Sequence, residues 1–536
     1  MPRPFLPLAA ALLLPAALLA QSNATTELMT YGDVLGSQSQ ARLSGATPST
    51  PAFLVPSFLK TGSGYLVAQT GDPADRLAVG IDLASGGTYF TGTTDGSGNW
   101  TRNFGIPNNP ALLDRDVYFQ AFTRPGGGGA GEYDDFSNLR WINLNNAGRW
   151  QGAGSDLPVA SALVASAVLE TGANGRAVAI FSCGGGPLLV TDVSNPYPTT
   201  DKAWIYDSRR GTTTELLEVM NTGRAFHTAT LLQDGRVLVT GGVTYGGQKP
   251  NGDYFTKVLS DAEVWDPVAG SFTAVPMSQY RAGHTANLLP DGRVLVAGGT
   301  KGNGLHELTD VADLLGTSNK DTELFDPATN SFSAGPWMTE PKAGHGGVTL
   351  QDGRVWLGGG ITFTTIFGIP IPDFSTKVNL YDPATNTIGS GGNVGNARAL
   401  FGSTLMADGR VAVIAGAGGD IFNIGPLTAC HLWDPNGNVT TFLATLPTDN
   451  AFGGVVQLPT GELLVAGGAG GTLDDPVPDD TLYRIDPLTG ALTTLSPMLV
   501  DHAGGVTVLL EDGTLYVGGG ESNAGLAVVN AESYSY

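Results

Sequence analysis

The sequence predicts an all-β protein, a seven-bladed β-propeller preceded by a small β-sandwich-like N-terminal domain. Composition is the first observation: the 536 residues include 77 glycines, and only 14% of them are charged. This composition suits many short strands joined by tight turns better than long amphipathic helices. Length is the second observation, because one hydrophobic core rarely serves so long a chain. The third is a motif of a tight turn, an apolar run and paired glycines that occurs seven times.

The N-terminus has the features of an export signal, predicted as residues 1–20. Arg3 supplies a positive charge, residues 12–19 form the core of an apolar run, and Ala20 is a small residue before the predicted cleavage point. A membrane anchor is the alternative, but the run is too short to span a bilayer comfortably. We therefore expect an exported bacterial protein without a membrane span, either secreted or held in the cell envelope.

Residues 21–123 lack the repeat and predict the β-sandwich-like accessory domain. Strand-like runs lie at 65–69, 77–81, 88–91 and 117–122, and clusters of turn residues separate them. Residues 124–138 are rich in glycine and predict a linker. The propeller is then expected over residues 139–536.

The repeat is a four-strand unit. The first two strands are joined by an Asp-Gly or similar turn, for which we expect a two-residue hairpin with positive φ at both central residues. The second strand ends in a glycine pair such as Gly241-Gly242, and the third ends in an aromatic residue followed by Asp-Pro, as in Trp265-Asp266-Pro267. Counted between turn glycines, the intervals are 60, 57, 61, 56, 52 and 52 residues. The turn glycines are Gly175, Gly235, Gly292, Gly353, Gly409, Gly461 and Gly513.

Glycine pairs, aromatic-Asp-Pro endings and an Arg or Lys at the start of many units resemble kelch repeats over roughly residues 140–536. The resemblance implies propeller blades around a central axis. The last unit is one strand short, and residues 148–152 look like an orphan outer strand. We expect this strand to complete the seventh blade, which would close the ring and remove two free sheet edges.

Two positions in the aligned units carry candidate chemistry. Eight residues before the turn glycine stand His227, His284 and His345. Three histidines suggest a metal site, but no carboxylate or cysteine recurs beside them to complete a ligand set, so we predict local hydrogen bonding and no metal. Cys183 and Cys430, the only cysteines, lie in well-separated units and are expected to be separate thiols.

Cations recur eleven residues before the turn glycine. Because every unit begins on the same face, these side chains predict a partial ring that attracts an anionic ligand or an acidic peptide. The alternative is structural, with each side chain pairing with carboxylates or loop carbonyls of a neighbouring blade. The predicted ligand-binding residues are Arg224, Arg281, Lys342, Arg398 and His502.

A sandwich domain joined to a kelch propeller is also the architecture of galactose oxidase. That resemblance implies a copper site with tyrosines, histidines and a tyrosine cross-linked to a cysteine. In this chain Cys183 lies beside the glycines of its unit, and the next unit begins with Phe226 where a tyrosine would be needed. We therefore predict no catalytic residues and no cofactor.

The predicted function is an exported, non-catalytic protein that presents one propeller face to a protein or glycan ligand. The segments 243–260, 300–320 and 361–376 are long for hairpin connections, and such loops carry function. A net charge of −22 disfavours nucleic acid as a partner. The alternative is a carbohydrate-active enzyme, either a kelch-type sugar isomerase or a galactose oxidase-like oxidoreductase. The oligomeric state stays open.

Overall fold

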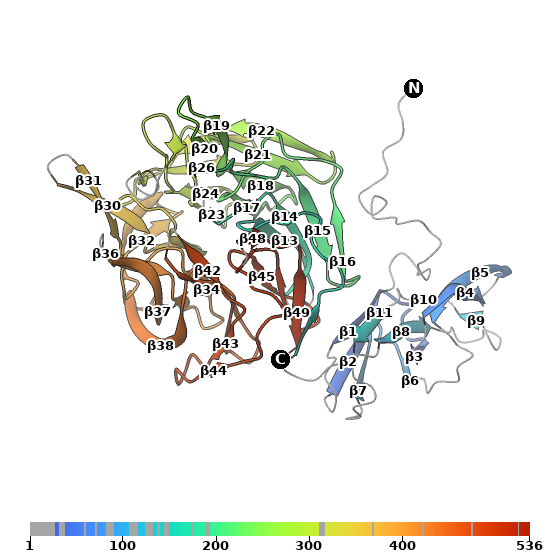
Figure 1. Ribbon diagram of the computed structural model, residues 1–536. Coiled ribbons are helices and arrows are strands. Elements are labelled where there is room, and N and C mark those ends of the chain that lie inside the picture. Colours follow the sequence, from blue (N-terminus) through green and yellow to red (C-terminus); the bar gives the residue numbers. More distant parts are fainter. Residues whose placement is uncertain are drawn as a thin grey trace, which may run out of the picture.

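The computed structural model is all-β (Figure 1). It describes residues 27–535 except 32–37, 58–59, 70–71, 82–89, 107–115, 124–131, 134, 137–139, 144–148, 173–175, 189–192, 310–312, 314–316, 367–368, 421–422, 473–474 and 524. The predicted signal peptide, residues 1–20, lies outside this range. Among the described residues, no helix has the length and apolar character needed to cross a membrane.

Seven antiparallel sheets form the blades of a β-propeller, as the sequence predicts, and each contains four blade strands. The sheet of blade 5 also includes a fifth strand, β36 (Ala417–Asp420). Within each blade the strands are given from the axis outward. Blade 1 contains β13 (Ala165–Thr171), β14 (Ala177–Cys183), β15 (Ala203–Asp207) and β16 (Thr212–Glu215). Blade 2 contains β17 (Thr228–Leu231), β18 (Val237–Thr240), β21 (Asp261–Asp266) and β22 (Ser271–Pro276). Blade 3 contains β23 (Thr285–Leu288), β24 (Val294–Ala297), β26 (Thr322–Asp326) and β27 (Ser331–Ala334).

The remaining blades follow the same order around the axis. Blade 4 contains β28 (Gly346–Thr349), β29 (Val355–Gly358), β32 (Lys377–Asp382) and β33 (Thr387–Asn393). Blade 5 contains β34 (Gly402–Leu405), β35 (Val411–Ile414), β37 (Asn423–Asp434) and β38 (Val439–Asn450). Blade 6 contains β39 (Gly454–Gln457), β40 (Leu463–Ala466), β43 (Leu482–Ile485) and β44 (Leu492–Thr494). Blade 7 contains β45 (Val506–Leu509), β46 (Leu515–Gly518), β49 (Ala531–Ser535) and β12 (Arg149–Gly152).

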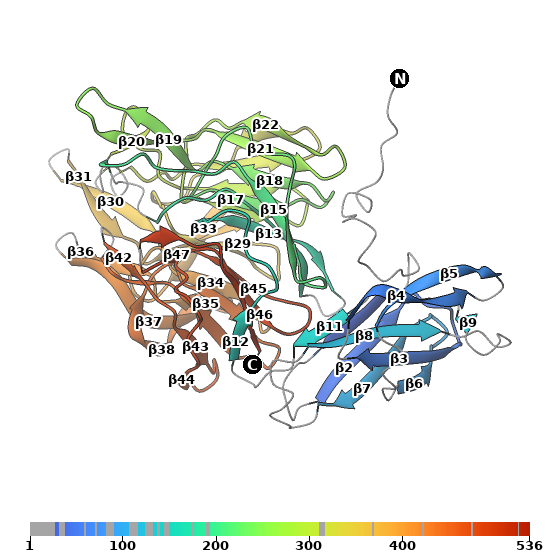
Figure 2. The same ribbon diagram turned by 45° about the vertical axis from the view of Figure 1, so that its right-hand side comes forward.

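The seventh blade joins the two ends of the propeller sequence. Its three inner strands come from the C-terminus, and its outer strand β12 precedes blade 1 in the chain (Figure 2). Trp150 of β12 stands opposite Tyr534 of β49, with their ring centroids 5.0 Å apart. The Trp150 indole also donates a hydrogen bond of 2.9 Å to the Ser496 carbonyl of the preceding blade. This pairing closes the ring and gives the last blade its fourth strand.

The hydrophobic core of the propeller lies between the blades. Phe181 of blade 1 stacks on Trp265 of blade 2 at 4.8 Å, and Tyr206 of blade 1 lies 4.4 Å from Tyr516 of blade 7. All four side chains are buried. The second strand of blades 2 to 7 is buried along its whole length, because blades pack against both of its faces.

The turn between the first two strands differs from the prediction. In blade 2, Leu232 and Arg236 close a loop of three residues, and the Gly235 amide bonds the Leu232 carbonyl at 3.1 Å. Only Gly235 has a positive φ, of 87°, whereas Asp234 does not. This is a type I turn followed by a glycine bulge rather than a two-residue hairpin. The Asp side chain instead accepts the backbone N–H of Arg236 at 3.1 Å.

The N-terminal domain consists of three small sheets. One joins β1 (Glu27–Tyr31), β2 (Gln38–Ser44) and β7 (Trp100–Gly105). The second joins β3 (Pro51–Ser57), β6 (Phe90–Thr93), β8 (Asp116–Thr123), β10 (Asp135–Phe136) and β11 (Arg140–Asn143). The third joins β4 (Lys60–Gln69), β5 (Asp72–Ile81) and β9 (Glu132–Tyr133).

The boundary of this domain differs from the predicted one. Strands β9 and β10 fall in the predicted linker, residues 124–138, and β11 falls at the predicted start of the propeller. All three pair with strands of the N-terminal domain instead. Strand pairing decides this boundary. Strand β3 covers one edge of β8, and β10 and β11 cover the other edge, which would otherwise be free.

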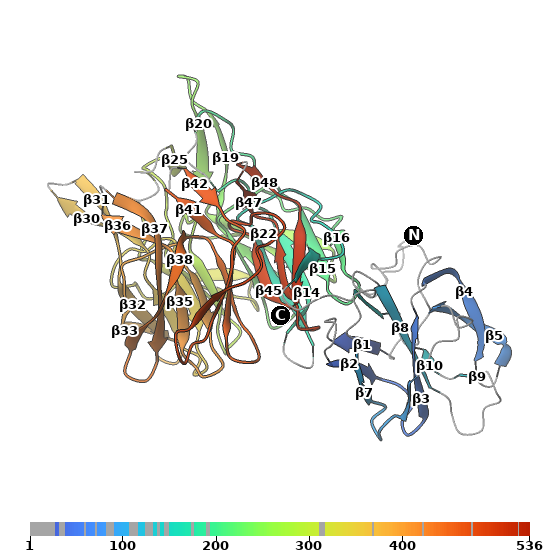
Figure 3. The same ribbon diagram turned by 60° about the horizontal axis from the view of Figure 1, so that its bottom comes forward.

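Two faces of the propeller differ. We call the face with the connections from second to third strands the loop face, and the one with the Asp-Gly turns the turn face. Figure 3 shows extra strands rising on the loop face. These are β19 (Val243–Gln248), β20 (Tyr254–Val258), β25 (Glu307–Leu308), β30 (Ile361–Ile366), β31 (Ile369–Phe374), β36 (Ala417–Asp420), β41 (Ala469–Gly471), β42 (Pro476–Pro478), β47 (Glu521–Ser522) and β48 (Leu526–Ala527).

Ring closure yields the first prediction. Trp150→Ala should lower the free energy of unfolding by about 3–5 kcal/mol, because it empties a buried site at the closing strand. Trp337→Ala is the control, since that side chain is 66% exposed and its loss should cost about 0.5 kcal/mol or less. Urea titration of both variants measures the difference. Equal stability of the two variants would contradict closure through β12.

Candidate functional site at the mouth of the loop face

The blades are joined by one backbone hydrogen bond that recurs around the ring. The N–H of the second glycine of each pair donates to the carbonyl of the residue that opens the next unit, at 2.7–2.9 Å. The donors and acceptors are Gly185 and Arg224, Gly242 and Arg281, Gly299 and Lys342, Gly360 and Arg398, Gly416 and Asn450, Gly468 and His502, and Gly520 and Ser161. In the first unit the equivalent residue is therefore Ser161, which lies fourteen residues before the turn glycine Gly175 rather than eleven.

The side chain of the same opening residue binds its own blade. In blades 2 to 7 it makes a hydrogen bond with the carbonyl of the first residue of the glycine pair or its equivalent, 17 residues further on. Arg224 therefore reaches the Gly241 carbonyl at 2.9 Å. We call the two bonds together the blade clamp, because one residue fixes a blade to its neighbour and also fixes its own second strand.

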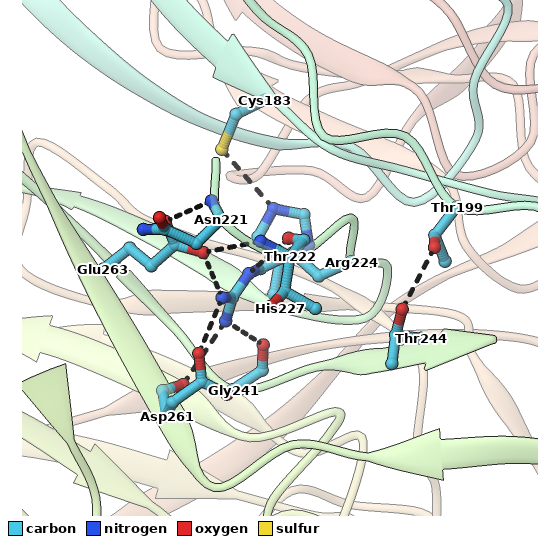
Figure 4. Close-up of polar contacts among 10 residues, drawn as sticks. All are labelled: Cys183, Thr199, Asn221, Thr222, Arg224, His227, Gly241, Thr244, Asp261 and Glu263. Carbon is cyan, nitrogen blue, oxygen red and sulfur yellow. Dashed lines mark hydrogen bonds and ion pairs between the residues drawn. The ribbon is translucent and has the colours of Figure 1, made fainter. Parts of the chain in front are cut away.

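Buried carboxylates complete the clamp in blades 2 and 3. Figure 4 shows Arg224 between Glu263 and Asp261, at 2.6 Å and 3.1 Å. Glu263 also accepts the backbone and side-chain N–H groups of Asn221, each at 2.7 Å. In blade 3 the Arg281 guanidinium lies 2.7 Å from Glu323 in the same arrangement. Both arginines are fully buried.

Later blades use different partners for the opening residue. Lys342 donates to two loop carbonyls at 2.8 Å and lies 3.2 Å from Glu340, and burial lowers its pKa to about 8. Arg398 lies 2.9 Å from the Nδ1 atom of His431, and burial lowers the pKa of this arginine to about 10. His502 lies 3.2 Å from a buried glutamate of the C-terminal strand.

The structure gives the five predicted ligand-binding residues a different role. Arg224, Arg281, Lys342, Arg398 and His502 have at most 1% of their surface exposed, and each is bonded within its own blade. A ligand at the loop face does not reach them. The sequence shows their spacing but not their burial, which the third strand and the loops of each blade produce.

The three repeated histidines pack against the preceding blade. Nε2 of His284 lies 2.8 Å from the Thr240 hydroxyl, and Nε2 of His345 lies 3.1 Å from that of Thr285. Burial, followed by the nearby cations, lowers the pKa of His227 and His345 to about 3. The described residues contain no group of three His, Cys, Asp or Glu side chains that could hold a metal. Each of these histidines makes a local contact through Nε2, as predicted, whereas its buried Nδ1 atom has no hydrogen-bond partner.

Cys183 and Cys430 are buried and free, so the predicted separate thiols are confirmed. The Cys183 sulfur lies 3.5 Å from Nε2 of His227 (Figure 4), a pair that resembles a nucleophile and its base. Burial raises the pKa of the thiol and lowers that of the imidazole. The pair is therefore neutral and unsuited to nucleophilic chemistry, which needs the thiolate.

A ring of strained residues surrounds the axis on the loop face. Nine residues before the turn glycine in units 2 to 7, and at Leu163 in unit 1, the backbone has a φ of 52–66°. These residues are Leu163, Phe226, Gly283, Gly344, Leu400, Phe452 and Gly504. Six hydrogen bonds of 2.7–3.2 Å link each to the next, except between Leu163 and Phe226. Four large apolar residues in this backbone region cost of order 1–3 kcal/mol each, and such strain gathers at functional sites.

We call this ring and the loops around it the mouth of the propeller. Phe226 and Leu163 pack on an apolar cluster that includes Tyr197, Val258 and Leu308 from the loops of three blades. Sequence reasoning missed these residues. The available signal was the position nine residues before the turn glycine, which in units 2 to 7 is always glycine or a large apolar residue.

Copper, which the resemblance to galactose oxidase implies, does not fit the seven described residues of the ring at the mouth. Copper in proteins takes nitrogen, sulfur or oxygen ligands. Leu163, Phe226, Leu400 and Phe452 carry no such atoms, and the other ring positions are glycines. The histidine nearest to Cys183 is already placed between blades.

Comparison with solved structures shows the same fold. A fungal alcohol oxidase of the AA5 family, solved in complex with copper, aligns with a TM-score of 0.51 and 18% identity, over 73% of this chain and 76% of that one. YjhT aligns with a TM-score of 0.44 and 19% identity, over 64% of this chain and 99% of that one. No protein-family model and no curated protein sequence matches the chain. The chain therefore has a kelch-type propeller fold.

The clamp yields the second prediction. Arg281→Met should lower the free energy of unfolding by about 3–5 kcal/mol, because Glu323 stays buried without a partner. Arg293→Met is the matched control on the turn face. Its side chain is 32% exposed, so its ion pair contributes about 1 kcal/mol or less. A small effect of Arg281→Met in chemical denaturation would favour a ligand-binding role instead.

The histidines yield the third prediction. Their folded pKa lies below the unfolded value of about 6.5, so the unfolded chain takes up the proton first as the pH falls. Stability should fall as the pH drops below 6.5, by up to about 1.4 kcal/mol per pH unit for each histidine, and for His345 this fall continues toward its folded pKa of about 3. His345→Phe introduces the residue that blade 5 carries at the same position. This variant should lose the contribution of one histidine to the slope of unfolding free energy against pH. Urea midpoints between pH 6.5 and 5 measure it. Phe401→Leu should leave the slope unchanged, and an unchanged slope in His345→Phe would refute the assignment.

Proposed function

We propose that this protein is an exported, non-catalytic binding protein whose ligand, a protein or a glycan, binds at the loop face of the propeller. The observation that carries the proposal is the contrast between the two faces. Short turns of nearly constant length form the turn face, whereas connections of variable length, with strands of their own, rise around the mouth on the loop face. Variable loops on a rigid scaffold are the usual place for binding.

Charge at the turn face supports this choice. Four turns repeat Asp-Gly-Arg, and in each the Arg side chain lies 2.6–2.7 Å from the Asp of the same turn. These pairs satisfy each other and leave little free charge for a ligand. At the loop face, the side strands present charged and aromatic side chains that the blade clamp does not use.

The non-catalytic part of the proposal rests on the chemistry available at the mouth. Acid–base or nucleophilic catalysis needs a titrating group within reach of the substrate. The recurring cations that open the units are fully buried in the blade clamp, and the described ring at the floor of the mouth consists of apolar residues and glycine, so that floor offers no such group. Export rests on the sequence of residues 1–20 alone.

The fourth prediction concerns the binding face. The purified chain is screened on a glycan array and against a displayed random-peptide library, and the bound probe is then located by hydrogen–deuterium exchange. Protection should lie in residues 243–260 and 300–309 of the loop face, whereas the turns at 233–236 and 290–293 stay unchanged. Protection confined to the turns would overturn the proposal. Formation of hydrogen peroxide from a sugar alcohol by the copper-treated chain would favour the oxidoreductase instead.

A further inference from the structure

An aromatic stack lies beside the mouth in blade 3. The rings of Tyr280 and His306 are parallel within 4°, with centroids 3.6 Å apart. Tyr280 directly precedes Arg281, the fully buried opening residue of the blade. Both rings are partly exposed, and neither belongs to the blade clamp.

The backbone holds His306 rigidly in this position. Its φ is 61°, in the left-handed region, and its N–H donates to the Asn303 carbonyl at 2.8 Å. The Nδ1 atom lies 3.1 Å from the Lys301 carbonyl. The Asn303 side chain also accepts the N–H of Leu305 at 2.9 Å. A ring held in this way loses little conformational entropy when a ligand stacks on it.

Charged groups continue the surface from the stack to the neighbouring side strand. Glu307 follows His306 and begins β25, which pairs with β20 of blade 2. Its carboxylate lies 3.1 Å from the Lys249 ammonium. Lys249 in turn lies over the ring of Phe255 at 5.6 Å. We call these five residues the aromatic strip: Tyr280, His306, Glu307, Lys249 and Phe255.

We propose that the aromatic strip binds a neutral saccharide chain. This inference rests on the proposed function and narrows its ligand to a glycan. A pyranose has an apolar C–H face that stacks on a flat ring and a rim of hydroxyls that need donors and acceptors. The partly exposed stack of Tyr280 and His306 offers flat rings at one end of the strip, and the carboxylate and the ammonium continue from it, with the ammonium over the ring of Phe255.

The charges of the strip select among ligands. Cores of protein interfaces are depleted of charged residues, whereas the carboxylate and the ammonium lie at the centre of this strip. Because these two groups pair, the strip presents little net charge to attract an anion or a cation. A neutral polyhydroxylated ring uses both as hydrogen-bonding partners without separating them.

The fifth prediction uses two strip variants and one control on the full mature chain. Tyr280→Leu keeps apolar contact with the core but removes the flat ring. His306→Asn removes the stacked ring at a position where Asn tolerates positive φ. Phe442→Leu is the control, because Phe442 is 63% exposed on the outer strand of blade 5. Isothermal titration uses soluble galactomannan, xyloglucan and mixed-linkage β-glucan as probes.

At least one of these polysaccharides should bind the wild-type chain, and both strip variants should weaken that binding at least tenfold. The control should bind as the wild type does, and thermal melting checks that each variant is folded. If Tyr280→Leu fails to fold, His306→Asn decides, since its change lies in a surface loop.

The outcomes separate this inference from the proposed function. Polysaccharide binding that survives both strip variants, with protection elsewhere on the loop face, would overturn the strip and leave the proposed function standing. Binding of none of the three polysaccharides would also overturn the strip. A peptide that binds the loop face and competes at the strip would replace the glycan by a protein ligand.

Discussion

One backbone hydrogen bond holds the propeller together, from the second glycine of each pair to the carbonyl that opens the next unit. It occurs at all seven blade junctions, and the last one, from Gly520 to Ser161, joins the last blade to the first. The close approach that this bond requires explains the glycine pairs. A Cβ atom on Gly242 would lie 2.6 Å from the Ala225 carbonyl oxygen, and one on Gly241 would lie 2.4 Å from that of Arg281.

The buried opening residues follow from the same constraint. A chain that turns into the inner strand beside a neighbouring glycine pair leaves loop carbonyls and amides in the interior, and these need partners. A long cationic side chain with several donors satisfies the carbonyls. A carboxylate such as Glu263 then neutralises the cation and accepts the loop amides. Lys342, Arg398 and His502 occupy the same position but bind other partners. The residue type therefore varies between blades, whereas the side-chain hydrogen bond to the carbonyl 17 residues further on is kept.

This framework leaves the two faces with different freedom. The turn face is fixed by the turns that start every second strand, and its Asp-Arg pairs are satisfied locally. The loop face has a constant ring of strained residues at its floor, but the segments above that ring differ in length, in strands and in side chains. A binding surface can therefore change there without disturbing the blade junctions. An AA5 alcohol oxidase with this fold was solved in complex with copper, whereas the ring at the floor of the mouth of this chain consists of apolar residues and glycine.

The sequence by itself determined the number of blades and the strand order within each blade. The reason is that the backbone geometry of each blade locally requires turn glycines, glycine pairs and aromatic-Asp-Pro endings. These residues recur at similar intervals in the sequence. The orphan strand at 148–152 was also visible, since the last unit lacks one strand.

Only the tertiary structure decided what the recurring cations do. Their spacing showed that Arg224 and Arg281 open equivalent units, but burial depends on third strands and loops about 40 residues away. The boundary of the N-terminal domain was also decided by tertiary pairing, because β9 pairs with β4 and both β10 and β11 pair with β8. The stack of Tyr280 on His306 was equally invisible, since it joins two loops of variable length whose meeting no local pattern encodes.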